Sequence, residues 1–133
     1  MRLLLDTDAY SALKRGHPAV AVLVRRSEQI LFSTVVAGEL LYGFRSGTRY
    51  ERNRAELDEF LANPFVTVVP VTLATAHRFS IIAAGLKERG RPIPVNDIWI
   101  AAQAMETGAD LLSFDRHYQL VDGLAWHDLS ARR

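Results

Sequence analysis

Leu-Leu-Leu-Asp-Thr-Asp, residues 3–8, is the stretch of sequence that decides the fold. Three consecutive leucines are typical of a short strand buried on both faces, as in a parallel sheet covered by helices. Asp6 follows where this strand should end, and chemistry in open parallel sheets gathers just beyond the carboxyl ends of the strands. A charge directly after a buried apolar run is costly unless something pairs with it. We therefore expect other polar groups to meet Asp6 at this edge of the sheet.

The composition is that of one folded domain. A chain of 133 residues with 49% apolar side chains can bury about two-thirds of its unfolded surface. Cysteine is missing from the sequence, which excludes disulfides and thiolate metal sites and fits a reducing compartment. The early acid Asp6 argues against a secretory signal, and prolines interrupt the weakly charged residues 61–76. We expect a cytoplasmic protein with no transmembrane span.

The apolar pattern predicts strands that alternate with helices. Strands are expected at residues 3–5, 29–33, 66–71, 109–114 and 124–126. Helices are expected at residues 7–15, 18–26, 34–45, 50–61, 72–90 and 96–107, with Thr34 and Asn96 as caps and a helical turn at 115–119. Two prolines make residues 91–95 an extended loop. This alternation implies an α/β fold, a single-domain three-layer α/β/α sandwich with a mainly parallel sheet of four to five strands.

Four carboxylates are expected to converge at one edge of this sheet. Asp6 and Asp115 each follow an apolar strand directly, Asp97 opens a helix, and Glu39 lies about one turn into the helix after the second strand. Like charges brought together raise one another's pKa unless cations are present. Oxygen ligands without histidine or cysteine select hard cations, so the predicted cofactor is Mg²⁺ or Mn²⁺.

Each carboxylate also has a purely structural interpretation. Asp6 and Asp115 could cap the helical segments that follow them, and Asp97 could stabilise the first turn of its own helix. Taken singly, these are the commoner roles. Glu39 differs, because it points out of an apolar arc of its helix, where the structural alternative is a buried ion pair with an arginine.

The residues around these acids resemble a known family. The pattern consists of Leu-Leu-Asp-Thr-Asp at 4–8, Ala-Gly-Glu-Leu-Leu-Tyr-Gly at 37–43, Asn-Asp-Ile-Trp-Ile-Ala-Ala at 96–102 and Leu-Ser-Phe-Asp at 112–115. It resembles PIN-domain ribonucleases and, more narrowly, the VapC toxins of bacterial toxin–antitoxin pairs. The resemblance spans nearly the whole chain, which we interpret as a single PIN domain over residues 1–133. One departure is Tyr118, where the family more often has phenylalanine.

The resemblance implies a function and a partner. It implies a metal-dependent endoribonuclease that hydrolyses RNA phosphodiester bonds and leaves a 5′-phosphate. It also implies a homodimer whose small cognate antitoxin covers an apolar groove and extends a basic side chain to the acids. The family's metal-binding acids match Asp6, Glu39, Asp97 and Asp115, with Thr7 and Ser113 as small polar neighbours. We expect Asp6 and Asp97 to be the principal ligands.

Basic side chains are candidates for contacts with RNA phosphates. Lys14 and Lys87 are the only lysines, and arginine suits phosphate better than lysine does, although codon bias explains the same composition. The net charge of +1 does not by itself indicate nucleic-acid binding. Arg116, beside Asp115, is the best candidate. Arg45, Arg49, Arg52 and Arg54 are also possible contacts, but ion pairs on a solvated helix face are the favoured interpretation.

Aromatic side chains and histidines near the four acids are weaker candidates. His117 could approach the substrate, whereas the other three histidines are interpreted as ordinary surface or core residues. Tyr42 and Trp99 are interpreted as core side chains rather than as platforms for RNA bases.

Two other functions fit parts of the sequence. Asp6-Thr7-Asp8 also resembles the nucleophile motif of haloacid-dehalogenase-like phosphohydrolases, with Asp6 as nucleophile and Thr34 as the next signature. Those enzymes need a further lysine and a late acidic pair without clear counterparts here, and they give Glu39 no role. The remaining alternative is a non-catalytic PIN-like module that binds RNA or a partner, against which the presence of all four acids argues.

Overall fold

Five short strands form one parallel sheet in the computed structural model, which describes residues 1–131. The strands are β1 (Arg2–Leu5), β2 (Gln29–Ser33), β3 (Val66–Val69), β4 (Asp110–Ser113) and β5 (Trp126–Asp128). Their spatial order is β3-β2-β1-β4-β5, and every neighbouring pair is parallel. The prediction of a parallel α/β sheet with four to five strands is confirmed. β1, which carries the leucines, lies in the middle of the sheet.

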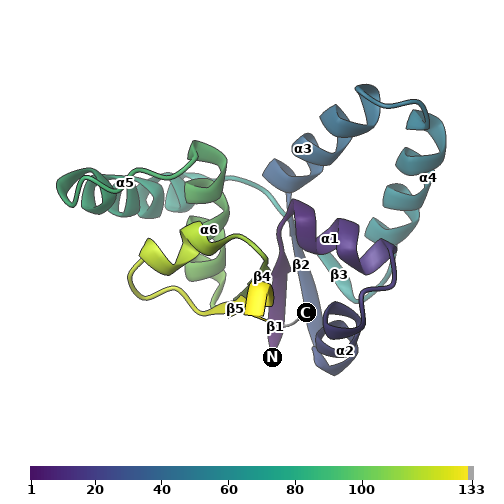
Figure 1. The fold of residues 1–133 in the computed structure, drawn as a ribbon, viewed down its shortest axis with the longest axis horizontal. Helices are drawn as coiled ribbons and strands as arrows, with labels where there is room; N and C mark the ends of the chain where they lie inside the picture. The colour runs from purple at the N-terminus through teal and green to yellow at the C-terminus, as the bar shows by residue number, and fades with distance from the viewer. Residues whose placement is uncertain (132–133) are drawn as a thin grey trace.

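Helices cover both faces of the sheet (Figure 1). They are α1 (Thr7–Lys14), α2 (Pro18–Arg26), α3 (Thr34–Arg45), α4 (Tyr50–Leu61), α5 (Leu73–Glu88) and α6 (Val95–Thr107), with short 3₁₀ segments η1 (Arg116–Leu120) and η2 (Leu129–Ala131). Alternate residues of β1 face opposite layers: Leu4 packs in the cluster that contains α6, whereas Leu3 and Leu5 pack with α1 and α2. All three leucines are fully buried, as predicted for a strand covered on both sides.

A buried amide fixes α6 to the sheet. The Gln103 side chain is fully buried, and its Nε2 donates to the Val69 carbonyl at the end of β3 over 3.0 Å. Its Oε1 accepts a hydrogen bond from the Ser33 hydroxyl at the end of β2. The helix that carries Asp97 is therefore tied to two strands at the same end of the sheet.

The structure corrects several predicted boundaries. Ser33, and not Thr34, caps α3, because its hydroxyl accepts from the Val35 amide at 2.9 Å. α6 begins at Val95 after Pro94, so Asn96 lies within the helix instead of capping it. The last strand occupies Trp126–Asp128 instead of residues 124–126, since β4 pairs Leu111 with Trp126. No helix within residues 1–131 combines the length and apolar character needed to cross a bilayer.

Candidate active site

The four predicted acids line a single cavity at the carboxyl ends of the central strands. Its volume is about 170 Å³. Asp6 reaches it from the end of β1, Glu39 from α3, Asp97 from the first turn of α6, and Asp115 from the residue before η1. The lining residues are Asp6, Thr7, Asp8, Glu39, Asp97, Ile100 and Asp115. The fold thus brings carboxylates from four separate segments to one place.

Asp6 is the most deeply buried of these acids. Its side chain is 6% exposed. One oxygen accepts from the Ala9 amide at 2.9 Å, and the other accepts from the Ser113 hydroxyl. Its pKa is raised to about 7, chiefly by burial and also by the charges of Asp8 and Asp97, although both hydrogen bonds act to lower it. Asp6 therefore caps α1, which confirms its structural interpretation, and it also lines the cavity.

Glu39 is held by neutral donors. The Thr7 hydroxyl donates to Oε1 over 2.8 Å, and the Asn96 amide donates to Oε2 over 3.3 Å. Among residues 1–131, no arginine pairs with Glu39, so the buried ion pair considered as an alternative is not formed. Thr7 and Asn96 fix this carboxylate at the cavity without neutralising its charge.

Asp97, Asp115 and His117 form a compact group of side chains that could hold a metal ion. One potential ligand atom from each lies within 4.8 Å of the others. The Nδ1 atom of His117 is 3.3 Å from Oδ2 of Asp97 and 2.9 Å from Oδ1 of Asp115. His117 thus brings a nitrogen atom beside the carboxylate oxygens that the sequence predicts as ligands. The spacing Asp115-x-His117 in a predicted helical turn was the available sequence signal.

Tyr118 holds the carboxylate of Asp97 by a hydrogen bond. Its ring is buried, and its hydroxyl donates to Oδ1 of Asp97 over 3.3 Å. The pKa of Asp97 is raised to about 6, chiefly by burial and also by the charge of Asp115, although hydrogen bonds from His117 and Tyr118 act to lower it. Burial and the nearby carboxylates also raise the pKa of Tyr118, which keeps the phenol protonated as a donor. Tyr118, the one residue noted as a departure from the family pattern, thus contacts Asp97, a candidate metal ligand.

Ser113 links two of the acids across the sheet edge. Its hydroxyl donates to Asp6 and also accepts from the Asp115 amide at 2.9 Å. Asp115 itself caps η1, because Oδ1 accepts from the His117 amide at 2.9 Å. A small hydroxyl at this position therefore joins the Asp6 carboxylate after β1 to the backbone of Asp115 after β4.

Other residues singled out in the sequence lie apart from the cavity. Arg116 is exposed and is not among the lining residues. Arg52 pairs with Glu56 and Arg54 with Asp58 along α4, which confirms the solvated helix face. Of the two aromatic residues interpreted as core, Trp99 is partly buried and stacks on Phe79 at 4.0 Å. Tyr42 is 76% exposed, so that interpretation of Tyr42 is wrong.

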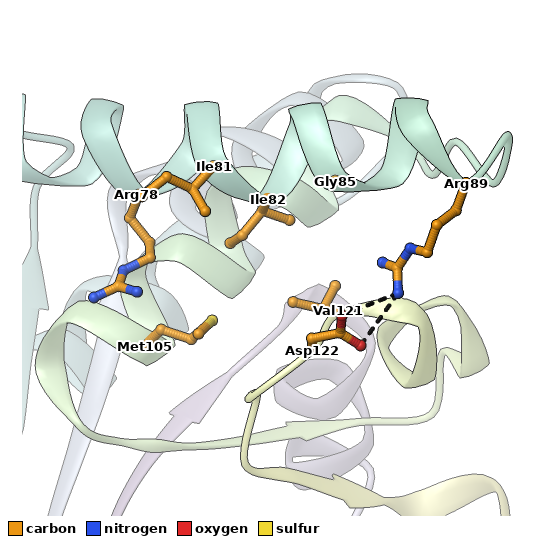
Figure 2. A pocket seen from close by; sticks show the side chains of 8 residues that line it. All are labelled: Arg78, Ile81, Ile82, Gly85, Arg89, Met105, Val121 and Asp122. Atoms are coloured by element: carbon orange, nitrogen blue, oxygen red, sulfur yellow. Dashed lines mark hydrogen bonds and ion pairs between the residues drawn. The ribbon is translucent and has the colours of Figure 1, made fainter.

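A larger cavity lies elsewhere on the molecule, between α5, α6 and the segment after η1 (Figure 2). Its volume is about 280 Å³ and much of its lining is apolar, including Ile81 and Ile82. Figure 2 shows Asp122 already paired with Arg89, at 3.1 Å. This larger cavity offers a single carboxylate, which is already in an ion pair, so the smaller, acid-lined cavity is the candidate active site.

The donor set of the smaller cavity fits a hard divalent cation. Carboxylate oxygens are the ligands that Mg²⁺ and Mn²⁺ prefer. Asp6 and Asp97 have raised pKa values, chiefly because burial disfavours their ionised forms and also because neighbouring carboxylates repel them. A bound cation would stabilise the ionised forms.

The sequence model of the PIN domain matches residues 3–124. The chain belongs to the PIN domain family. Curated relatives of this PIN domain include Ribonuclease VapC2 of Haemophilus influenzae, 30% identical with 85% of this chain and 86% of the relative covered. Ribonuclease VapC1 of the same species is 28% identical, with 96% and 98% covered. A solved structure of VapBC-1 from nontypeable Haemophilus influenzae matches with 25% identity and a TM-score of 0.85, covering 98% of this chain and 99% of the other.

The family assignment and the geometry agree against the phosphohydrolase alternative. A haloacid-dehalogenase-like mechanism would use Asp6 and leave Glu39 without a role. In this PIN domain Glu39 lines the same cavity as Asp6 and is held there by Thr7 and Asn96.

Proposed function

We propose that this PIN domain is a metal-dependent endoribonuclease, the toxin of a toxin–antitoxin pair, acting in the cytoplasm. The observation that carries the proposal is the convergence of Asp6, Glu39, Asp97 and Asp115 on one cavity. The matching relatives bear the name ribonuclease VapC, which supports RNA as the substrate.

Each side chain of the site is given a proposed role in metal binding, positioning or substrate contact. Asp6 and Asp97 are the principal ligands of Mg²⁺ or Mn²⁺, and Glu39 and Asp115 complete the site directly or through water. When bound, such an ion lowers the pKa of a water molecule and offsets phosphate charge. Thr7 and Ser113 hold the carboxylates of Glu39 and Asp6 in place. Arg116, exposed next to Asp115, is the candidate contact for an RNA phosphate.

A cognate antitoxin and a second copy of the chain are the proposed protein partners. The structural relative is a VapBC complex, which supports the antitoxin. Apolar side chains on the surface of α5 support a protein contact, since Leu73 is 75% and Ile81 is 65% exposed. Analytical ultracentrifugation of the purified chain, alone and with its antitoxin, tests both partners.

RNA cleavage by the purified chain tests the nuclease assignment. We expect cleavage with Mg²⁺ or Mn²⁺, loss with EDTA, and a loss of at least about 100-fold for Asp6→Asn, since removing groups that act together is costly. The matched control is Asp58→Asn, an exposed acid on α4 outside the cavity, which should retain full activity. Cleavage that survives both EDTA and Asp6→Asn would reject the mechanism. RNA binding without products and without a metal effect would favour the non-catalytic module.

A further inference from the structure

We propose that His117 supplies a nitrogen ligand to the divalent ion held by Asp97 and Asp115, and that this ligand makes the site prefer Mn²⁺ to Mg²⁺. The proposal deepens the proposed nuclease function and rests on it. It concerns a residue outside the four acids.

The spacing of the three side chains matches neighbouring ligands of one ion. Nδ1 of His117 lies 3.3 Å from an Asp97 oxygen and 2.9 Å from an Asp115 oxygen. Adjacent ligands of an octahedral ion bound at about 2.1 Å lie about 3 Å apart. One ion placed among these atoms would reach the nitrogen and both carboxylates without a rearrangement of the backbone.

The local structure directs the ring toward these carboxylates. Asp115 caps η1 by accepting from the His117 amide, and this fixes the turn that brings the imidazole back over the acid. Tyr118 donates to Oδ1 of Asp97, which leaves Oδ2 facing Nδ1. The His117 side chain is 50% exposed, so water and ions can reach it.

Ligand chemistry gives the metal preference. Mg²⁺ favours oxygen ligands and retains several waters. Mn²⁺ belongs to the first-row transition metals, which bind imidazole nitrogen more readily than Mg²⁺ does, and it also accepts carboxylates. A mixed site of one nitrogen and several oxygens therefore gains more with Mn²⁺. If His117 only donates a hydrogen bond to the carboxylates, no such preference arises.

Pulsed electron paramagnetic resonance of Mn²⁺ bound to the full chain tests the ligand directly. We expect the parent protein to show coupling between Mn²⁺ and an imidazole nitrogen, and His117→Asn to lose it. The matched control is His127→Asn, because His127 also pairs with a carboxylate, Asp110 at 2.9 Å, outside the cavity. This control should keep the nitrogen signal.

Calorimetric titration with MnCl₂ and MgCl₂ tests the preference. For His117→Asn we expect Mn²⁺ affinity to fall about tenfold or more, by analogy with the losses seen on altering metal-site neighbours. Mg²⁺ affinity should fall by much less, and His117→Gln should behave like His117→Asn. Mn²⁺ bound to the parent without nitrogen coupling would overturn the proposal while leaving the nuclease intact. A parent that binds neither ion and cleaves no RNA would overturn the proposed function as well.

Discussion

Burial of the Asp6 carboxylate disfavours its ionised form. Its pKa is raised to about 7, whereas in the unfolded chain it ionises near 3.8. Between these values the folded protein holds a proton that the unfolded chain has released. Stability contributed by this group is therefore complete below about pH 4 and is lost as the pH rises toward 7.

Chemical denaturation across this pH range checks the sign of the effect. In EDTA, the free energy of unfolding of the parent relative to Asp6→Asn should fall as the pH rises from about 4 to about 7. The comparison with the variant removes the contributions of the other acids. A difference that stays constant, or that rises with pH, would show that Asp6 ionises normally in the folded state.

At the scale of single elements, α6 depends on its buried amide. Replacing Gln103 by leucine leaves the Ser33 hydroxyl and the Val69 carbonyl without their partner. We expect the free energy of unfolding to fall by about 1–3 kcal/mol, because buried polar groups without hydrogen bonds are costly. Urea denaturation measures this. Gln119→Leu is the matched control on an exposed residue of η1, and equal effects of the two substitutions would contradict the role given to Gln103.

Elements with a strong apolar pattern are the ones that sequence predicts well. The leucines of β1 are buried on both faces, and α4 spans residues 50–61 as its amphipathic pattern predicts. The sequence predicts β5 at the wrong residues, because this short, half-buried edge strand contains His127 and Asp128 and has no apolar run. Its position is set by pairing with β4, which is a long-range contact that local patterns do not encode.

In the candidate site too, some features could be predicted from the sequence, whereas others depend on long-range contacts. Strand ends and helix starts place the four acids at one edge, so their meeting was predictable from topology. The hydrogen bonds of Tyr118 to Asp97 and of Asn96 to Glu39 were not, because they depend on side-chain directions across elements. The place of His117 depends on the 3₁₀ turn of η1, which the sequence indicates only as a helical turn.

At the scale of the whole molecule, the acids join segments that are far apart in the chain. Without metal, their repulsion opposes the packing of α6 against the end of β1, and burial raises the pKa of Asp97 to about 6. Asp97→Asn should therefore melt several degrees above the parent at pH 7 in EDTA, since about 1 kcal/mol corresponds to roughly 4 °C. Differential scanning calorimetry measures the shift.

Added Mn²⁺ should reverse the order of the melting temperatures of the parent and Asp97→Asn. The parent is expected to gain more melting temperature from the ion than Asp97→Asn does, because binding to the folded state alone stabilises it. Asp122→Asn, outside the acid-lined cavity, should follow the parent in both buffers. Equal melting temperatures for the parent and Asp97→Asn with and without Mn²⁺ would contradict close packing of the carboxylates.

The Ser113 bridge between Asp6 and Asp115 has a consequence for protein synthesis. A growing polypeptide presents Asp6 well before Ser113, which follows it by 107 residues. Because domains assemble as units once their partners in the sheet are available, the pocket cannot form until β4 and the turn that carries Asp115 have left the ribosome.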